Sequence, residues 1–368
     1  MPESYPGIRC ALKKYRRNKG LSQEELASLV NVRRQAIYDM ESGKYLPNTA
    51  VALRLARVLG CTVEILFAEE RPAAQGALRL LGDASSPFSR LALAKVRETL
   101  VGIPLDEDRG LSFELRSSDG TVSGDRQGIT LLPGADPEKN ILILGCDPAL
   151  SLLREHTSRF AAGLRAHAMF ASSGRALRVL SEGASHVAGI HFHSDGNDDA
   201  NMAAVRAYLP GVPCILVAFS RQEEGLMVAA GNPLGIRGVE DLARPDLRFA
   251  GREQGAALRA LLDALLTRQN IPSDMVHGRL REVRSHCEGA FHVACNAADA
   301  ATGLRVIAKS FGLDFIPLAV TSYDLAIPKD ITAHPGVDAL LNVLQSGELR
   351  RELQSLPGYD VSETGAVS

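Results

Sequence analysis

The chain has 368 residues, 45% of them hydrophobic and 23% charged, and a formal net charge of −2. This length accommodates two or three domains, and the composition excludes a disordered chain, a fibre and an integral membrane protein. No window reaches the about 18 apolar residues of a spanning helix, and the N-terminus lacks the apolar core of a signal peptide. We therefore expect a cytoplasmic protein with no membrane partner.

Charge is distributed unevenly along the sequence. Residues 1–60 carry eleven Lys or Arg and five Asp or Glu, a net charge of +6, so the remainder carries −8. This asymmetry is typical of a small nucleic-acid-binding head on a body with another role. The six cysteines form no C-x-x-C pair and are expected to be reduced thiols. A redox switch is the alternative, with Cys146, Cys287 and Cys295 as its candidates.

Residues 1–70 predict an all-α head of short helices. Ser22 and Glu25 have the spacing of a capping box at the start of one helix. Leu26, Leu29 and Val30 are expected to face inward from it. The helices expected from apolar spacing span residues 8–18, 22–30, 33–41, 49–59 and 62–67.

The segments LSQEELA (21–27), VRRQAI (32–37) and ESGKYLPN (41–48) carry a family pattern. They resemble the Xre family of lambda-repressor-like helix-turn-helix domains. The resemblance implies that the third helix enters the major groove of double-stranded DNA while the second lies across the phosphate backbone. The residues implied to contact DNA are Gln23, Arg33, Arg34, Gln35, Tyr38, Lys44 and Asn48. One such domain covers little DNA, so a homodimer or higher oligomer is expected.

Residues 71–139 are expected to form a linker and a small β-rich subdomain. The segments 111–117 and 127–133 have strand character, and Asp119-Gly120 between them is a hairpin-turn signal. Residues 88–105 form a mixed stretch that ends with alternating character. No chemistry is indicated here.

From residue 140 to 361 strands alternate with helices, and residues 362–368 form a tail. Apolar strands at 141–146, 167–173 and 186–193 each lead to a helix or turn, with Asp147 as the N-cap before Pro148. Long crossing segments at 213–231 and 315–328 predict two lobes joined by two strands. A single C-terminal helix is expected from Val337 to Leu353.

The segments DPAL (147–150), AGIH (188–191), GLMVAAGNPLGI (225–236), EDLARP (240–245) and LPGYDV (356–361) carry a second pattern. They resemble the type II periplasmic-binding-protein fold, in a branch related to molybdate- and tungstate-binding proteins that occurs fused to helix-turn-helix heads. The expected fold is therefore multidomain, with an all-α head, a small β-rich connector and an α/β two-lobed body.

A ligand cleft is expected where loops after strands lead into helices. The first-turn N–H groups of a helix carry partial positive charge, which suits an oxyanion or a carboxylate. Where members of the fold carry Gly-Ser-Gly-Thr-Arg, this chain has Gly-Ala-Ala-Leu-Arg at 255–259, so the amides and Arg259 remain. The candidate ligand residues are Asp147, Ser172, Ser173, Gly174, Arg252, Gln254, Gly255, Arg259, Ser285, His286, Arg305 and Tyr323. The alternative for any one of them is a structural role, such as helix capping by Ser172 or a solvated Arg259.

The sequence offers one candidate metal site. His191 and His193 would point the same way on a strand and, with Asp195, could bind Zn²⁺. No further Cys or His follows at ligand spacing, so no metal and no cofactor are expected. No G-x-S-x-G nucleophile elbow is present either.

The prediction is a ligand-responsive DNA-binding transcriptional regulator rather than an enzyme. Its effector is expected to be a small anion, with molybdate or tungstate favoured. A small organic carboxylate is the alternative ligand. An enzyme tethered to DNA and an intracellular anion store are the alternative classes.

Overall fold

The structure, a computed structural model, describes residues 8–69, 78–82, 89–105, 116–122, 129–193, 200–277 and 281–368. The chain divides into two compact units, residues 1–75 and 76–368. Across these described ranges, no helix has the length and apolar character needed to cross a membrane.

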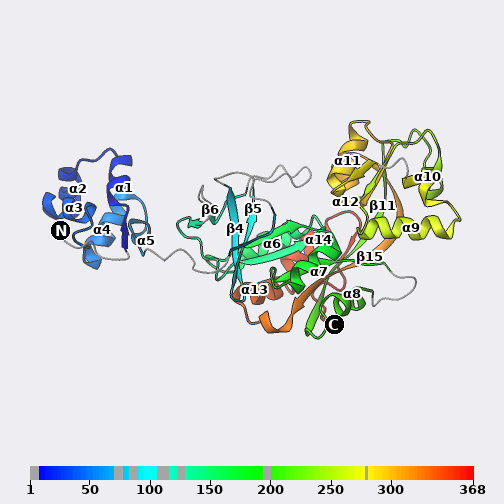
Figure 1. The fold of residues 1–368 in the computed structure, drawn as a ribbon. Helices are drawn as coiled ribbons and strands as arrows, with labels where there is room; N and C mark the ends of the chain where they lie inside the picture. Colours follow the sequence, from blue (N-terminus) through cyan, green and yellow to red (C-terminus); the bar gives the residue numbers. More distant parts are fainter. Residues whose placement is uncertain are drawn as a thin grey trace. The chain divides into compact units, whose positions relative to one another are not determined.

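The first unit is a helical bundle closed by a short two-stranded sheet (Figure 1). Its elements are β1 (Ile8–Cys10), α1 (Leu12–Asn18), α2 (Gln23–Val30), α3 (Arg34–Glu41), α4 (Thr49–Leu59), α5 (Val63–Leu66) and β2 (Phe67–Glu69). Strand β1 pairs antiparallel with β2, which joins the two ends of the unit. The core contains Leu12, Leu26, Ile37, Leu55 and Leu66, all with no exposed side-chain surface.

Local sequence signals explain the α2–α3 turn. The predicted capping box is confirmed, because Ser22 accepts from the Glu25 amide while the Glu25 side chain accepts from the Ser22 amide. Asn31 ends α2 in the left-handed conformation, which asparagine tolerates better than most residues.

Two expectations for the head were wrong. Residues 8–10 form a strand rather than the first helical turn, and Leu29 is 58% exposed rather than facing inward.

The second unit begins with a five-stranded sheet of order β3-β5-β4-β6-β7. Its strands are β3 (Leu78–Leu80), β4 (Arg90–Val96), β5 (Thr99–Pro104), β6 (Gly120–Val122) and β7 (Ile129–Leu131). Residues 90–104 form an antiparallel hairpin that turns at Arg97, which has a positive φ of 52°. Ala92 and Val101 share one hydrophobic core with Leu142 of the larger sheet, so this connector packs directly on the body.

The Asp119-Gly120 turn prediction was wrong, because Gly120 already begins β6 and Asp119 is fully buried. Asp119 accepts from the Leu93 amide at 2.8 Å and lies 2.7 Å from His167 Nε2 and 3.1 Å from an Arg165 nitrogen. Burial acts to raise the pKa of Asp119, but His167, the Leu93 amide and Arg165 together hold it below its ordinary value. The aspartate is therefore an anchor between the two sheets. The segment predicted at 111–117 lies mostly outside the described residues.

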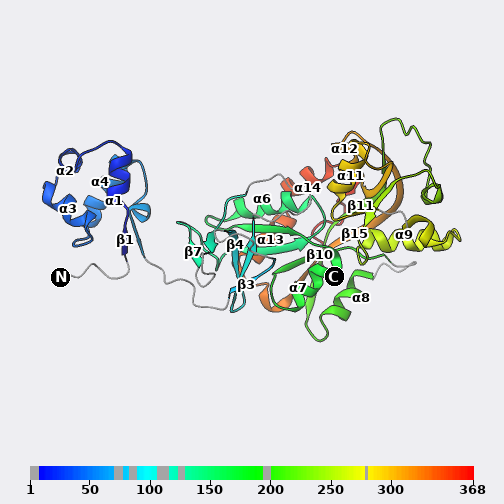
Figure 2. The ribbon, with the colours of Figure 1, turned by 45° about the horizontal axis from the view of Figure 1, so that its top comes forward.

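The larger sheet has the order β13-β12-β14-β11-β15-β10-β8-β9, with β16 paired to β11. Figure 2 labels its strands β10, β11 and β15. One lobe comprises β8 (Ile141–Gly145), α6 (Leu150–Phe160), β9 (Ala166–Phe170), α7 (Ser173–Ser181), β10 (Val187–Ile190), α8 (Ala200–Tyr208), η2 (Lys329–Ile331), α13 (Pro335–Leu344), α14 (Gly347–Gln354) and β16 (Tyr359–Asp360). The other comprises η1 (Val239–Ala243), β12 (Phe249–Arg252), α9 (Ala257–Arg268), α10 (Ser273–His277), β13 (Arg281–Val283), α11 (His286–Ala294), β14 (Ala300–Leu304) and α12 (Arg305–Ser310).

Two long strands join the lobes, as the crossing segments predicted. They are β11 (Cys214–Val228) and β15 (Asp314–Pro328), which pair antiparallel along their whole length. Each of the two strands runs through both lobes. In the first lobe β15 pairs with β10, and in the second lobe β11 pairs with β14. The register slips twice, once between Ala218 and Ser220 and once between Glu224 and Gly225. Such irregularities bend and twist a strand pair where it passes between lobes.

Two helix boundaries in the body differ from expectation. The C-terminal helix is divided into α13 and α14, because Ser346 caps a new helix through its hydroxyl. Helix α6 begins at Leu150 rather than at Pro148. Asp147 instead accepts from the Ala149 amide in a turn before the helix.

Candidate ligand site and nucleic-acid interface

A small cavity lies between the two lobes at the carboxyl ends of the parallel strands. Its volume is about 10 Å³, room for about one water molecule. One lobe contributes Cys146, Ser172, Ser173 and His191, and the other contributes Arg252, Ala256, Ala257, Leu258 and His286. The lobes are therefore closed on each other around a nearly filled crevice.

The first turns of three helices meet at this cavity. Helix α7 presents Ser172 and Ser173, α9 presents residues 256–258, and α11 presents His286. The first amide N–H groups of a helix have no partner within that helix, and they carry the positive end of its dipole. Three such ends facing one space favour a negatively charged occupant.

The two serines play different roles. The Ser173 hydroxyl donates to the His191 carbonyl and accepts from the His191 amide, both at 3.1 Å, which fixes the end of β10 against α7. Ser172 holds the N-cap position of α7, yet its side chain makes no capping hydrogen bond. Ser172 thus lines the cavity, and its hydroxyl is not used to cap the helix.

Arg252 provides a buried positive charge at the cavity wall, with only 2% of its surface exposed. Its guanidinium binds Glu253 through two contacts of 2.9 Å and lies over the Phe170 ring at 5.4 Å. Burial lowers the pKa of His286 well below its ordinary value, and the charge of Arg252 lowers it further. His286 is therefore a neutral donor or acceptor beside a cation.

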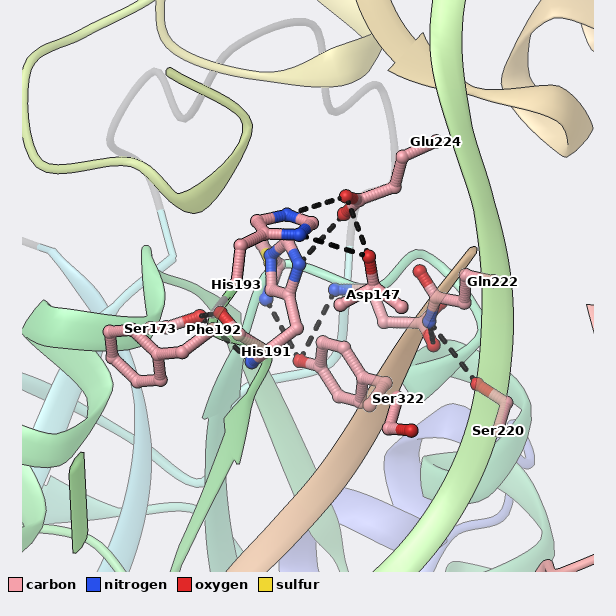
Figure 3. A network of polar contacts seen from close by, with 12 residues as sticks. Asp147, Ser173, His191, Phe192, His193, Ser220, Gln222, Glu224 and Ser322 are labelled. Carbon is pink, nitrogen blue, oxygen red and sulfur yellow. Dashed lines mark hydrogen bonds and ion pairs between the residues drawn. The ribbon is translucent and has the colours of Figure 1, made fainter. Parts of the chain in front are cut away.

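A buried cluster of two histidines and a glutamate adjoins the cavity, which its member His191 also lines (Figure 3). His191 Nδ1 lies 2.7 Å from Glu224 Oε1, and His193 Nε2 lies 2.8 Å from Glu224 Oε2. Burial acts to lower the pKa of His191, but Cys146 and Glu224 raise it well above its ordinary value. The histidines likewise hold the pKa of the fully buried Glu224 far below its ordinary value despite desolvation. The cluster carries a carboxylate and at least one positive charge.

A second buried network surrounds Asp147 (Figure 3). Its carboxylate accepts from Gln222 Nε2, from the Ala149 amide at 2.8 Å and from the Tyr359 hydroxyl at 2.5 Å. Burial raises the pKa of Asp147 to about 6, against the lowering effect of these donors. The Tyr323 hydroxyl accepts from the amides of Cys146 and Asp147, at 3.1 and 3.3 Å. These two amides are therefore already occupied.

Four of the expected ligand residues line the cavity: Ser172, Ser173, Arg252 and His286. Asp147 and Tyr323 belong to the adjacent buried network, and the Ser285 hydroxyl accepts from the Glu288 amide as the cap of α11. The structure does not bring Arg259 or Arg305 to the cavity, because Arg259 contacts Asp263 and Arg305 pairs with Glu223 and stacks on Phe315. Gly174, Gln254 and Gly255 do not line it either, Gln254 and Gly255 being exposed.

The buried polar residues of β11 were missed from the sequence. Ser220, Gln222 and Glu224 share one face of this strand at alternate positions and are at most 5% exposed. Arg221 and Glu223, between them, are less buried. The polar run inside an otherwise apolar crossing strand was the available signal.

The candidate nucleic-acid interface is the exposed face of α3. Arg33, Arg34, Gln35 and Tyr38 are all exposed there, with Lys44 5.6 Å from the centre of the Tyr38 ring. Ile37 and Met40 form the buried side of the helix. The bases and phosphates of a DNA groove could reach this face without disturbing the core.

Two further residues expected to contact phosphate are engaged within the protein. Gln23 Nε2 donates to Glu41 at 2.8 Å, and Arg16 forms a two-atom ion pair with the same carboxylate. Asn48 Oδ1 accepts from the Val51 amide and caps α4. Both side chains therefore position helices.

Comparison with known proteins places the body in a family. The profile described as "PBP superfamily domain" matches residues 154–345, just over half of the chain. The chain belongs to the PBP superfamily. The protein YvgK of Bacillus subtilis is 30% identical over 234 residues, which cover 63% of this chain and 74% of YvgK.

A helix-turn-helix profile matches residues 12–66. An HTH-type transcriptional regulator of Archaeoglobus fulgidus is 42% identical over 60 residues, covering 16% of this chain and 86% of that protein. Among solved structures, the sulfate-binding protein SubI of Mycobacterium tuberculosis has a TM-score of 0.44 and 15% identity, covering 58% of this chain and 84% of SubI. The two profile matches and the Archaeoglobus relative show a helix-turn-helix domain of transcriptional-regulator type joined to a PBP-superfamily body.

Proposed function

We propose that this protein is a DNA-binding transcriptional regulator whose body binds a small anion between its lobes. The observation that supports the anion is the meeting of three helix starts with the buried Arg252 around one cavity. Each element favours negative charge, and no carboxylate is among the residues that line the cavity within the described part of the chain.

Anion binding would require the lobes to open, because the closed cavity holds about one water molecule. On re-closure the anion would take the place that Glu253 now holds on the Arg252 guanidinium. Glu253 is one-third exposed, so its side chain has room to swing into solvent. The Ser172 hydroxyl and the first-turn amides of α7, α9 and α11 would complete the site.

A tetrahedral oxyanion such as molybdate or tungstate is the ligand we favour. It presents acceptor oxygens in several directions, which matches donors arriving from three helices. A small organic carboxylate concentrates its acceptors at one end and is the competing ligand.

The anion would alter DNA binding through the two hinge strands. A ligand shifts a conformational equilibrium only by its different affinity for the two states. We propose that the protein acts as a homodimer that places two α3 helices about one DNA turn apart, so that lobe closure alters their spacing. Light scattering coupled to size exclusion would test the oligomeric state.

Isothermal titration of the full chain with molybdate, tungstate, sulfate and a set of small carboxylates tests the site. We expect Arg252→Gln to weaken oxyanion binding at least tenfold and Ser172→Ala to weaken it less. Arg305→Gln is the matched control, since this arginine pairs with Glu223 away from the cavity. Equal affinity in the wild type and Arg252→Gln, or no binding of any anion, would overturn the proposal. Carboxylate binding without oxyanion binding would replace the favoured ligand.

A further inference from the structure

The cluster of His191, His193 and Glu224 beside the cavity has features of a metal site that its role as an ion pair does not explain. His191 Nδ1, His193 Nε2 and Glu224 Oε1 are buried, and none has a hydrogen-bond partner among the described residues. Yet the two nitrogens lie only 2.7 and 2.8 Å from Glu224 oxygens. The contacts are short in distance but lack the direction of hydrogen bonds.

These atoms gather on a common space from two distant parts of the sequence. The histidines follow β10 in one lobe, and Glu224 lies on β11 at the point where the strand slips register. One ligand atom of each residue lies within 4.8 Å of the others. Figure 3 shows both imidazole rings turned toward the glutamate.

The opposite edge of each imidazole is also held. His191 Nε2 lies 3.1 Å from Cys146 Sγ, and His193 Nδ1 lies 3.4 Å from Thr321 Oγ1. The Thr321 hydroxyl donates to Glu224 Oε2 at 3.0 Å. Histidines that bind metals usually have such partners on the second ring nitrogen, which fix the tautomer and the ring orientation.

We propose that His191, His193 and Glu224 form a binding site for a divalent transition-metal ion. Two imidazoles and one carboxylate suit Zn²⁺ or a neighbouring first-row ion, whereas Mg²⁺ and Ca²⁺ prefer oxygen ligands. Three protein ligands leave at least one coordination position for water or another ligand. The ion would bridge one lobe and a hinge strand. Asp195, the carboxylate suggested by the sequence, lies outside the described residues. The carboxylate that the structure places with the two histidines is Glu224.

The test is a titration of the full chain with Zn²⁺ after treatment with EDTA and removal of the chelator. We expect one tight equivalent by competition with a chromophoric chelator. His193→Gln should weaken Zn²⁺ binding at least 100-fold, and it is the preferred variant because His193 is the least buried of the three. Glu224→Gln should act in the same direction, with circular dichroism confirming that the variant folds.

Two further variants separate a metal site from surface binding. His156→Gln is the control, since His156 also pairs with a glutamate, Glu352 at 2.6 Å, but has no second histidine in its ion pair. Its Zn²⁺ affinity should equal that of the wild type. Thr321→Val should lower the affinity 10- to 100-fold, the usual effect of removing an outer partner.

Co²⁺ supplies an independent readout, because ligand-field absorption reports the coordination of the ion itself. We expect a Co²⁺ spectrum in the wild type and in His156→Gln that is absent in His193→Gln. Absence of saturable Zn²⁺ binding, or equal losses in His156→Gln and His193→Gln, would show that the cluster is an ion pair only. Anion binding is measured separately, so failure of the metal site leaves the proposed regulator intact.

Discussion

The Tyr323 hydroxyl lies 3.1 Å from the Cys146 amide nitrogen and accepts a hydrogen bond from it. It also accepts from the Asp147 amide at 3.3 Å. Tyr323 is 1% exposed, so neither amide is satisfied by bulk water. A single side chain of β15 therefore ties the end of β8 to a hinge strand.

Replacing Tyr323 by phenylalanine should destabilise the body. The variant keeps the ring in its buried position but leaves two buried amides without their acceptor, which costs about 1–3 kcal/mol of unfolding free energy. Urea denaturation followed by circular dichroism measures the loss. Tyr45→Phe, at an exposed tyrosine of the head, should leave the free energy of unfolding unchanged. An unchanged Tyr323→Phe midpoint would mean that other groups satisfy the amides.

Gly189 of β10 should not tolerate a side chain. A Cβ added there would lie within 2.9 Å of the Tyr323 hydroxyl oxygen, Cε1 and Cζ. Overpacking of this kind typically costs about 1–3 kcal/mol, so Gly189→Ala should lower the unfolding midpoint. Gly347→Ala is the control, because its Cβ would meet only the flexible end of Arg351 at 3.6 Å. Equal midpoints for the two variants would contradict the packing described for Tyr323.

Much of the architecture followed from local pattern. Buried runs such as residues 141–145 and the long crossing segments identified the strands, and the capping box at Ser22 located α2. The fold predictions that were wrong depended on tertiary contacts. Asp119-Gly120 has the local chemistry of a turn, but His167 and Arg165 make burial of the aspartate favourable.

The candidate site was predictable to the same extent. Helix starts are visible in sequence, so Ser172, Ser173 and His286 could be placed at the cavity. Arg259 and Arg305 could not be excluded, because whether an arginine reaches a site depends on which carboxylate lies nearer in space. Glu224 was missed because its partners are more than 30 residues away along the chain.

Asp147 should give the body a characteristic pH dependence. Its folded pKa of about 6 lies above the ordinary value of 3.8, so the folded state holds this proton more tightly than the unfolded state does. The stabilisation is fully present below pH 3.8 and is lost as pH rises through 6. A rise in pKa from 3.8 to about 6 corresponds to about 3 kcal/mol of unfolding free energy.

Comparison with Asp147→Asn isolates this contribution from other titrating groups. The difference in unfolding free energy between wild type and variant should fall by up to about 3 kcal/mol between pH 4 and 7, and should be constant above pH 7. Urea denaturation in a series of buffers measures it. A wild type that gains stability relative to Asp147→Asn over this range would contradict the raised pKa.

Exposed arginines of α3 should carry DNA binding by the head. Arg33 and Arg34 lie at the start of this helix with no buried partner among the described residues, and an Arg34 nitrogen lies 4.0 Å from a Glu24 oxygen at the surface. Exposed pairs of this kind contribute little to stability, so alanine at either position should leave the fold intact. Each arginine that contacts a phosphate should, when removed, reduce the slope of log affinity against log salt by about one. A base contact should instead cost about 1–3 kcal/mol and relax specificity at one position.

Duplexes selected from a random pool by the full chain provide the DNA for fluorescence anisotropy over a range of salt concentrations. Arg206→Ala, at an exposed arginine of the body, is the charge-matched control and should bind as the wild type does. A further difference is expected for Gln35→Ala, which should change which sequences are selected with little change in the salt slope. The Gln35 side-chain amide is uncharged, and it donates a hydrogen bond to Asp39 on the same helix. If the arginine variants and Arg206→Ala weakened binding equally, the basic charge of the chain, and not the α3 face, would account for the affinity.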